Sequence, residues 1–194
     1  EALNVAGAWQ LPVVFVVNNN QWAISVPRRI QCGAPTLAQK AIGAGFAGEQ
    51  VDGNDVVAVY ERFGQALERA RHGKGPVLLE CLSYRLGDHT TADDATRYRP
   101  AEEVKQAWQE EPIKRLQAYL VAQGQWDETR EQALIADCQA QLQAAVLAYE
   151  AIGQQPAESA MDYVYAQWPA ALADQRELLL ARAARQLSGG SRHD

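Results

Sequence analysis

The chain has 194 residues, 47% hydrophobic and 22% charged, a composition typical of a soluble globular protein that can bury one sizeable core. Its net charge of −6 comes from residues 101–194, which hold fourteen acidic against eight basic residues, whereas residues 1–100 hold ten of each. This charge balance argues against a nucleic-acid-binding protein, which needs a basic surface. No apolar run reaches the ~18 residues that a membrane helix needs.

The cysteines and histidines exclude two further classes of site. Cys32, Cys81 and Cys138 are odd in number, widely spaced and without a CxxC pair, which indicates reduced thiols in a cytosolic protein rather than a disulfide framework or a zinc site. Three histidines are too few for a histidine-rich metal centre. The chain opens at Glu1 in mid-pattern and without a leader, so we expect a fragment of a longer protein.

Residues 1–100 alternate between short β-branched runs and amphipathic stretches, which predicts an α/β fold with a parallel sheet and right-handed crossovers. The expected elements, in chain order, are the end of a helix over 1–9, a strand over "PVVFVV", a loop over 18–35, a short helix from Thr36 to the glycines at 43 and 45, a strand over "GEQVDGND", a helix from Asp55 to the glycines at 73 and 75, and a strand over "PVLLECLSY".

After Pro100 the sequence becomes helical throughout. We expect two short helices broken before Pro112, a helix of roughly 38 Å from about Asp127 to Ile152, another from about Pro169 to Leu187, and a flexible tail. The predicted organisation is therefore an α/β part over 1–100, a helical extension for packing and subunit contacts over 101–187, and a tail over 188–194.

Two predicted loops leave the carboxyl ends of strands, where open parallel sheets bind their ligands. In the first, "NNNQWAISVP", the side-chain oxygen of Asn20 and the backbone carbonyl of Trp22 could together face a Mg²⁺ ion, which prefers hard oxygen ligands. The alternative is that the three asparagines only satisfy backbone groups of a turn, since the loop has no carboxylate to complete a cation site.

The second loop, "RLGDHTTADDATRYRP", is long and has no helical or strand period, which is typical of functional or disordered loops. His89 could donate a charge-assisted hydrogen bond to a phosphate or transfer a proton. The alternative is a solvated loop in which acidic residues and arginines pair with one another.

With both loops in view, three segments resemble the alpha subunit of the thiamine-diphosphate-dependent 2-oxoacid dehydrogenases: "EALNVAGAWQLPVVFVVNNNQWAISVP", "VDGNDVVAVY" and "SYRLGDHTTADDATRYR". The later "MDYVYAQWPAALADQRELL" resembles the closing segment of those subunits. The resemblance implies the thiamine-diphosphate-binding fold in part, without the Gly-Asp-Gly motif that stands upstream of the paired asparagines in the family.

The resemblance assigns roles to five residues. Asn20 and Trp22 correspond to Mg²⁺ ligands, through the side chain and the backbone oxygen respectively. Ile24 corresponds to an apolar residue near the cofactor rings, and the resemblance places its neighbour Ser25 among the cofactor-binding residues as well. His89 corresponds to the catalytic histidine that reaches the diphosphate and supports transfer to the lipoyl group.

The resemblance further implies oxidative decarboxylation of a 2-oxoacid, with pyruvate favoured and branched-chain 2-oxoacids as the alternative. The implied cofactors are thiamine diphosphate and Mg²⁺, and the implied partners are a beta subunit in an alpha2beta2 heterotetramer and the lipoyl domain of the acyltransferase core, in the bacterial cytoplasm. A non-catalytic assembly module is the rival interpretation, because the chain lacks the upstream motif.

Overall fold

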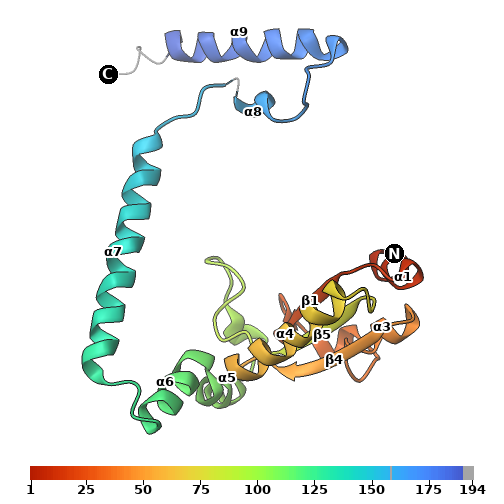
Figure 1. The fold of residues 1–194 in the computed structure, drawn as a ribbon. Helices are drawn as coiled ribbons and strands as arrows, with labels where there is room; N and C mark the ends of the chain where they lie inside the picture. The colour runs from red at the N-terminus through yellow and green to blue at the C-terminus, as the bar shows by residue number, and fades with distance from the viewer. Residues whose placement is uncertain (158, 190–194) are drawn as a thin grey trace. The chain divides into compact units, whose positions relative to one another are not determined.

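The computed structural model describes residues 1–157 and 159–189, which form two compact units, Glu1–Asp127 and Glu128–Asp194. The first unit contains a parallel sheet and the second is helical, in agreement with the predicted α/β part followed by helices (Figure 1). The predicted functional boundary near residue 100 remains a prediction.

The sheet of the first unit has three parallel strands in the order β1 (Val14–Asn19), β5 (Val77–Leu82) and β4 (Ala47–Asp52). The central strand β5 is buried along its first four residues, as expected for a parallel strand covered on both faces. All three strands overlap the predicted strand segments, although β1 continues through Asn18 and Asn19, which were expected in the loop. The parallel strand order requires the crossover connections that the alternation indicated.

Successive side chains of β5 point to opposite faces, so the sheet has two separate clusters of buried residues. On one face Leu78 packs with Ala38 and Ala41, near helices α1 (Ala2–Trp9) and α3 (Lys40–Gly43). On the other face Val77 and Leu79 pack against Ala66 of helix α4 (Val56–Arg71). The helix α4 begins at the predicted cap Asp55, whose carboxylate accepts hydrogen bonds from two backbone N–H groups.

Two local predictions are wrong. The segment expected to be an irregular loop contains an antiparallel hairpin, β2 (Trp22–Ala23) and β3 (Val26–Pro27), and a short helix α2 (Arg28–Gln31). The helix expected from Thr36 begins only at Lys40, because the preceding residues form a turn whose backbone is bound by a buried side chain of β5.

The remaining elements of the first unit are short helices, as predicted. They are the 3-10 helix η1 (Ala95–Arg97), α5 (Ala101–Ala107), the 3-10 helix η2 (Trp108–Glu110) and α6 (Pro112–Ala122). Pro112 stands at the start of α6, where its missing N–H costs nothing.

The second unit begins with the long predicted helix α7 (Glu128–Ile152). It continues with α8 (Ser159–Asp162), the 3-10 helix η3 (Ala170–Leu172) and α9 (Ala173–Gly189). The last helix ends two residues beyond the predicted Leu187, and the rest of the predicted tail, 190–194, lies outside the described residues. Within the described ranges, none of the helices is long and apolar enough to cross a membrane. All three cysteines are free thiols.

Candidate functional site

The two predicted loops lie side by side at the carboxyl ends of β1 and β5. The backbone N–H of Ser83 donates to the carbonyl of Asn19 (3.0 Å), and that of Arg85 donates to the carbonyl of Asn20 (3.1 Å). These hydrogen bonds continue the β1–β5 pairing past the strands, so the loop with His89 starts beside the three asparagines. The expectation that both loops gather at one edge of the sheet is therefore confirmed.

The three consecutive asparagines have three different environments. Asn18 accepts a hydrogen bond from the hydroxyl of Ser83 (2.7 Å). Asn19 is only 6% exposed and donates through Nδ2 to Oε1 of the buried Glu80 (2.6 Å). Asn20 is half-buried, and its Oδ1 accepts the N–H of Trp22 (3.1 Å). An amide oxygen has two lone pairs, so Oδ1 of Asn20 can hold this turn and still accept a second partner.

The β2–β3 hairpin leaves the carbonyl of Trp22 outside its ladder. Arg28 donates its N–H to the carbonyl of Gln21 (2.8 Å), which makes these two a hydrogen-bonded pair. Because such pairs alternate along an antiparallel ladder, the next pair, Trp22–Pro27, is not hydrogen-bonded, and Pro27 has no N–H to donate. The Trp22 carbonyl therefore points away from β3 and is available as a ligand.

The hairpin contains two residues with left-handed backbone conformations, Gln21 at φ 69° and Ile24 at φ 53°. This region is uncommon for any L residue and a clear outlier for a β-branched one such as Ile24. The carbonyl of Ile24 is held by Nη2 of Arg85 at 2.8 Å. The turn that carries Ile24 and its neighbour Ser25 is thus fixed by a residue of the second loop.

A continuous set of hydrogen bonds runs from this turn to the backbone of His89. The same Nη2 of Arg85 donates to the hydroxyl of Tyr98 (2.9 Å), which donates to Oδ2 of Asp93 (2.5 Å). That oxygen also accepts the backbone N–H of His89 (2.9 Å). The hydroxyl of Tyr98 and the N–H of His89 lower the pKa of the Asp93 carboxyl, and desolvation and the hydrogen bond to Asp93 raise the pKa of Tyr98.

The base of the second loop is fixed by Arg99, which is 7% exposed. Its guanidinium donates to the carbonyls of Arg85 and Leu86, and it lies 5.8 Å from the ring centroid of Tyr84. The segment from 85 to 99 is therefore an ordered loop closed by buried contacts. The alternative of pairing between acidic residues and arginines does not describe Arg85 and Arg99, which bind backbone carbonyls and, for Arg85, the hydroxyl of Tyr98.

The structure brings together four of the five predicted site residues on one segment, Asn20, Trp22, Ile24 and Ser25. His89 is joined to them through its backbone, by way of Asp93, while the residue itself is exposed. Ile24 is 55% exposed and Ser25 is exposed as well. The roles assigned to these five residues remain predictions.

The sequence interpretation did not single out Glu80, which is 0% exposed and lies in the middle of β5. Its two carboxylate oxygens accept hydrogen bonds from Asn19 (2.6 Å) and from the backbone N–H of Ala38 (2.9 Å). A lone carboxylate inside the apolar run "PVLLECL" was the available indication, since buried acidic residues are rare unless they have partners.

The donor set at this edge suits Mg²⁺ in kind but supplies only part of a coordination shell. Asn20 and Trp22 offer two neutral, hard oxygens, and Mg²⁺ takes six in near-octahedral geometry, with phosphates and waters among them. Among the described residues no group of three or more His, Cys, Asp or Glu side chains could hold a metal ion. A cation here would need oxygens from its ligand, from water or from other polypeptide.

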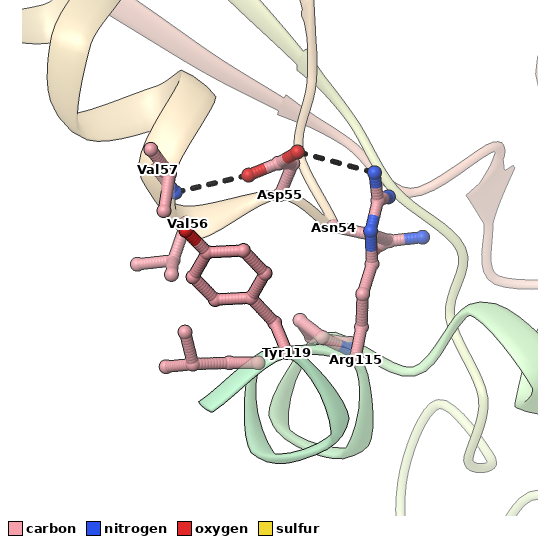
Figure 2. A pocket seen from close by; sticks show the side chains of 8 residues that line it. Asn54, Asp55, Val56, Val57, Arg115 and Tyr119 are labelled. Carbon is pink, nitrogen blue, oxygen red and sulfur yellow. Dashed lines mark hydrogen bonds and ion pairs between the residues drawn. The ribbon is translucent and has the colours of Figure 1, made fainter. Parts of the chain in front are cut away.

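Two pockets of similar size differ in their relation to this edge. One of about 320 Å³ is lined by the three asparagines, Trp22, Arg28 and Lys40, among others. The other, of about 310 Å³, lies between the start of α4 and α6, where Arg115 pairs with Asp52 (2.6 Å) and Asp55 (3.1 Å) (Figure 2). Arg115 is already paired with these two carboxylates. The first pocket lies at the predicted site and has two cationic side chains in its lining, Lys40 and Arg28, of which Arg28 donates through Nη2 to the carbonyl oxygens of Ala34 and Pro35.

An open parallel sheet flanked by helices defines an α/β protein, and in such sheets the carboxyl ends of the strands, where the two polar loops lie here, are the usual place for a ligand. The chain belongs to the dehydrogenase E1 component family, whose model matches residues 1–158. Members of this family depend on thiamine diphosphate. The resemblance drawn from the three sequence motifs is thereby confirmed.

Individual relatives carry two kinds of name. The chain is 42% identical over 179 residues to the pyruvate dehydrogenase E1 component subunit alpha of Staphylococcus epidermidis, covering 92% of this chain and 48% of the relative. It is 52% identical over 136 residues to the 3-methyl-2-oxobutanoate dehydrogenase subunit alpha of Mycobacterium tuberculosis, covering 70% of this chain and 37% of the relative. The chain spans about half the length, or less, of these curated relatives.

Proposed function

We propose that this chain is part of an alpha subunit that catalyses the oxidative decarboxylation of a 2-oxoacid and passes the acyl group to lipoamide. The family and the names of the relatives support this reading. The observation that carries it is the connection between Asn20 and the loop of His89, made by the backbone of Arg85 and by its side chain on Ile24.

Pyruvate is the proposed substrate and a branched-chain 2-oxoacid is the alternative. The staphylococcal pyruvate enzyme matches almost the whole chain, whereas the mycobacterial 3-methyl-2-oxobutanoate enzyme matches a shorter part at higher identity. The ratio of kcat/KM for pyruvate to that for 3-methyl-2-oxobutanoate, measured on the complete enzyme, distinguishes the two. A ratio above one supports pyruvate, and a ratio below one supports the branched-chain substrate.

In this proposal the hairpin holds the cofactor through a metal ion. Asn20 Oδ1 and the Trp22 carbonyl would hold Mg²⁺, and the exposed side chain of Ile24, with Ser25 beside it, would contribute to binding the cofactor. Thiamine diphosphate, when bound, supplies the carbon nucleophile for decarboxylation. His89 donates a hydrogen bond to the diphosphate and acts in the transfer to the lipoyl group.

The proposed partners follow from the same reading. The relatives are named alpha subunits, which supports a beta subunit as partner in an alpha2beta2 heterotetramer. The lipoyl domain of the acyltransferase core is the proposed acyl acceptor, reached through the exposed loop of His89. We assign the assembly to the bacterial cytoplasm, with no nucleic acid or membrane among its partners.

The test is the affinity of Asn20→Ala for Mg²⁺ at fixed thiamine diphosphate, measured by calorimetry on the complete subunit assembled with its beta subunit. We expect the dissociation constant to rise by about 10- to 100-fold or more, because loss of even an outer-shell partner has effects of that size. Asn18→Ala is the matched control, since it removes the same kind of side chain from a residue bonded to Ser83. Equal affinity in Asn20→Ala and wild type would contradict the assignment.

His89 is tested in the same assembly by two assays, decarboxylation with an artificial electron acceptor and acylation of a lipoyl domain. We expect His89→Ala to depress acylation more than decarboxylation, with the exposed His72 as the control histidine. Equal loss in both assays would leave His89 with only a cofactor-holding role. If neither the chain nor the assembly binds thiamine diphosphate, the rival non-catalytic module is supported.

A further inference from the structure

Glu80 joins three segments of the first unit from a position that solvent does not reach. It lies on the central strand β5, and its oxygens accept hydrogen bonds from the side chain of Asn19 at the end of β1 and from the backbone of Ala38 in the turn before α3. No part of Glu80 is exposed. It therefore cannot touch a ligand of the site, and any role that it has must act through its two partners.

The carboxylate determines which way the Asn19 amide points. A carboxylate only accepts hydrogen bonds, so Asn19 must turn its Nδ2 toward Glu80 (2.6 Å). The opposite end, Oδ1, then faces the chain that leaves β1 and accepts the N–H of Gln21 (3.2 Å). A reversed amide would place Oδ1 against the carboxylate and Nδ2 against an N–H group, and both hydrogen bonds would be lost.

The hydrogen bond from Gln21 to Asn19 lies at a bend where the backbone leaves β1. Gln21 has a left-handed conformation at φ 69°, which an L residue holds only when its surroundings impose it. The next turn repeats the pattern, with the N–H of Trp22 on Oδ1 of Asn20 (3.1 Å). The separation between Oδ1 of Asn20 and the Trp22 carbonyl thus depends on the bend at Gln21.

We propose that Glu80 is a positioning residue of the cofactor site: it orients the amide of Asn19, which fixes the bend at Gln21 and so holds Asn20 and the Trp22 carbonyl in place for the metal ion. This inference rests on the proposed function, because it gives Glu80 its role through the proposed metal ligands. The contact with Ala38 binds the wall of the adjacent pocket to the same carboxylate.

The first variant is Glu80→Gln, which keeps shape and size but has one acceptor oxygen for two donors, so its N–H₂ group must face the N–H₂ group of Asn19 or the backbone N–H of Ala38 and one of the two hydrogen bonds is lost. The second is the double variant Asn19→Asp with Glu80→Gln, which reverses donor and acceptor. In it the amide of residue 80 donates to the new carboxylate at residue 19, while its oxygen still accepts the N–H of Ala38. The new carboxylate can still accept the N–H of Gln21, and the net charge is unchanged.

The measurement is the dissociation constant of Mg²⁺ at fixed thiamine diphosphate in the complete alpha–beta assembly, together with the melting temperature of each variant. We expect Glu80→Gln to raise the constant by about tenfold or more, as for other residues that orient a metal ligand. We expect the double variant to return it to within about threefold of wild type, because all the hydrogen bonds are restored. The control is Leu79→Ala, which creates a cavity on the opposite face of the same strand.

The outcomes separate the inference from the proposed function. Weak binding in Glu80→Gln, recovery in the double variant and wild-type affinity in Leu79→Ala support the positioning role. If Glu80→Gln binds as wild type does, or if affinity follows melting temperature in Leu79→Ala as well, Glu80 is only a core residue and the proposed function stands. If Glu80→Gln does not fold, the double variant decides. A folded double variant with wild-type affinity for Mg²⁺ supports the positioning role of Glu80, and a folded double variant with weaker affinity overturns it. If wild type itself binds no cofactor, the proposed function and this inference both fail.

Discussion

Ile24 offers a direct test of the site backbone, because it has the left-handed conformation that a β-branched residue rarely adopts. We consider Ile24→Gly and Ile24→Ala together. Both remove the side chain that the proposal places near the cofactor, but only glycine adopts φ 53° without steric cost. The comparison therefore separates the backbone conformation from the side-chain contact.

The expected magnitudes follow from the conformation and the exposure of Ile24. A left-handed conformation costs an L residue about 1–2 kcal/mol. Glycine avoids this cost but loses about 0.5–1 kcal/mol more backbone entropy on folding. The Ile24 side chain is 55% exposed, so only part of its apolar surface is buried. Removing that buried part costs about 1 kcal/mol in either variant. Ile24→Gly should thus be more stable than Ile24→Ala by about 0.8 kcal/mol, and by about 1.5 kcal/mol at most.

The assay is urea denaturation of the complete subunit, with equal slopes across the three proteins so that the midpoints report the free energy of unfolding. Thiamine diphosphate affinity, measured in the same series, should fall to the same extent in both variants. An Ile24→Gly protein that is less stable than Ile24→Ala would refute the reasoning, since it would mean that the left-handed turn does not exist in solution.

Two further predictions concern the second loop and the packing beneath the site. The pKa of Asp93 lies below its ordinary value of 3.8, chiefly because its carboxylate accepts a hydrogen bond from the hydroxyl of Tyr98. The ionised carboxylate therefore stabilises the loop fully above pH 3.8, and this stabilisation is lost as the pH falls through the lower pKa of the folded state. A ¹³C NMR titration should show Tyr98→Phe raising the Asp93 pKa, and an unchanged midpoint would count against the hydrogen bond. Gly48→Ala should destabilise the protein by about 1–3 kcal/mol, because a Cβ there would lie 2.1 Å from the carbonyl oxygen of Ala38. Thermal melts check this against Gly64→Ala, which has open space and should lose no stability.

The long periodic elements could be predicted from the sequence because their apolar spacing is set by the same core that buries them. The strand Val14–Asn19 and the helix Val56–Arg71 follow such spacing. The helix Glu128–Ile152 could also be predicted from its apolar spacing, although none of its residues is buried. The hairpin Trp22–Pro27 could not be, since two-residue strands are too short to show alternation. Its turn also lacks the glycine or asparagine that normally marks a left-handed position, because Ile24 occupies it.

Tertiary contacts explain the helix that was expected too early. Thr36 has the chemistry of a helix cap, and the sequence from it is compatible with a helix. In the structure the N–H of Ala38, which a cap at Thr36 would satisfy, is bound instead by Glu80 from β5. A contact between residues 42 apart in the sequence outweighs the local preference, and no pattern within the segment indicates it.

The same long-range contact explains why three identical residues in a row have different roles. In the sequence Asn18, Asn19 and Asn20 are equivalent, and spacing alone could not tell a ligand from a turn residue. The structure distinguishes them by their partners: Asn18 meets a hydroxyl, Asn19 meets a buried carboxylate, and Asn20 meets only the backbone of its own turn. Asn20 is thereby the asparagine of the three whose side chain is bound only to a backbone N–H group, and its Oδ1 can accept a second partner.

The buried carboxylate also bears on how this edge of the sheet could hold a cation. Glu80 is the acidic residue of the central strand, yet both of its oxygens are bound to N–H groups in the core. The oxygens left at the surface, those of Asn20 and Trp22, are neutral. Two neutral oxygens cannot offset the dehydration of Mg²⁺, which proteins usually bind together with phosphate or carboxylate. In the proposed site the metal ion would therefore need the oxygens of the diphosphate, and we expect this edge to bind the ion together with the diphosphate rather than as a free ion.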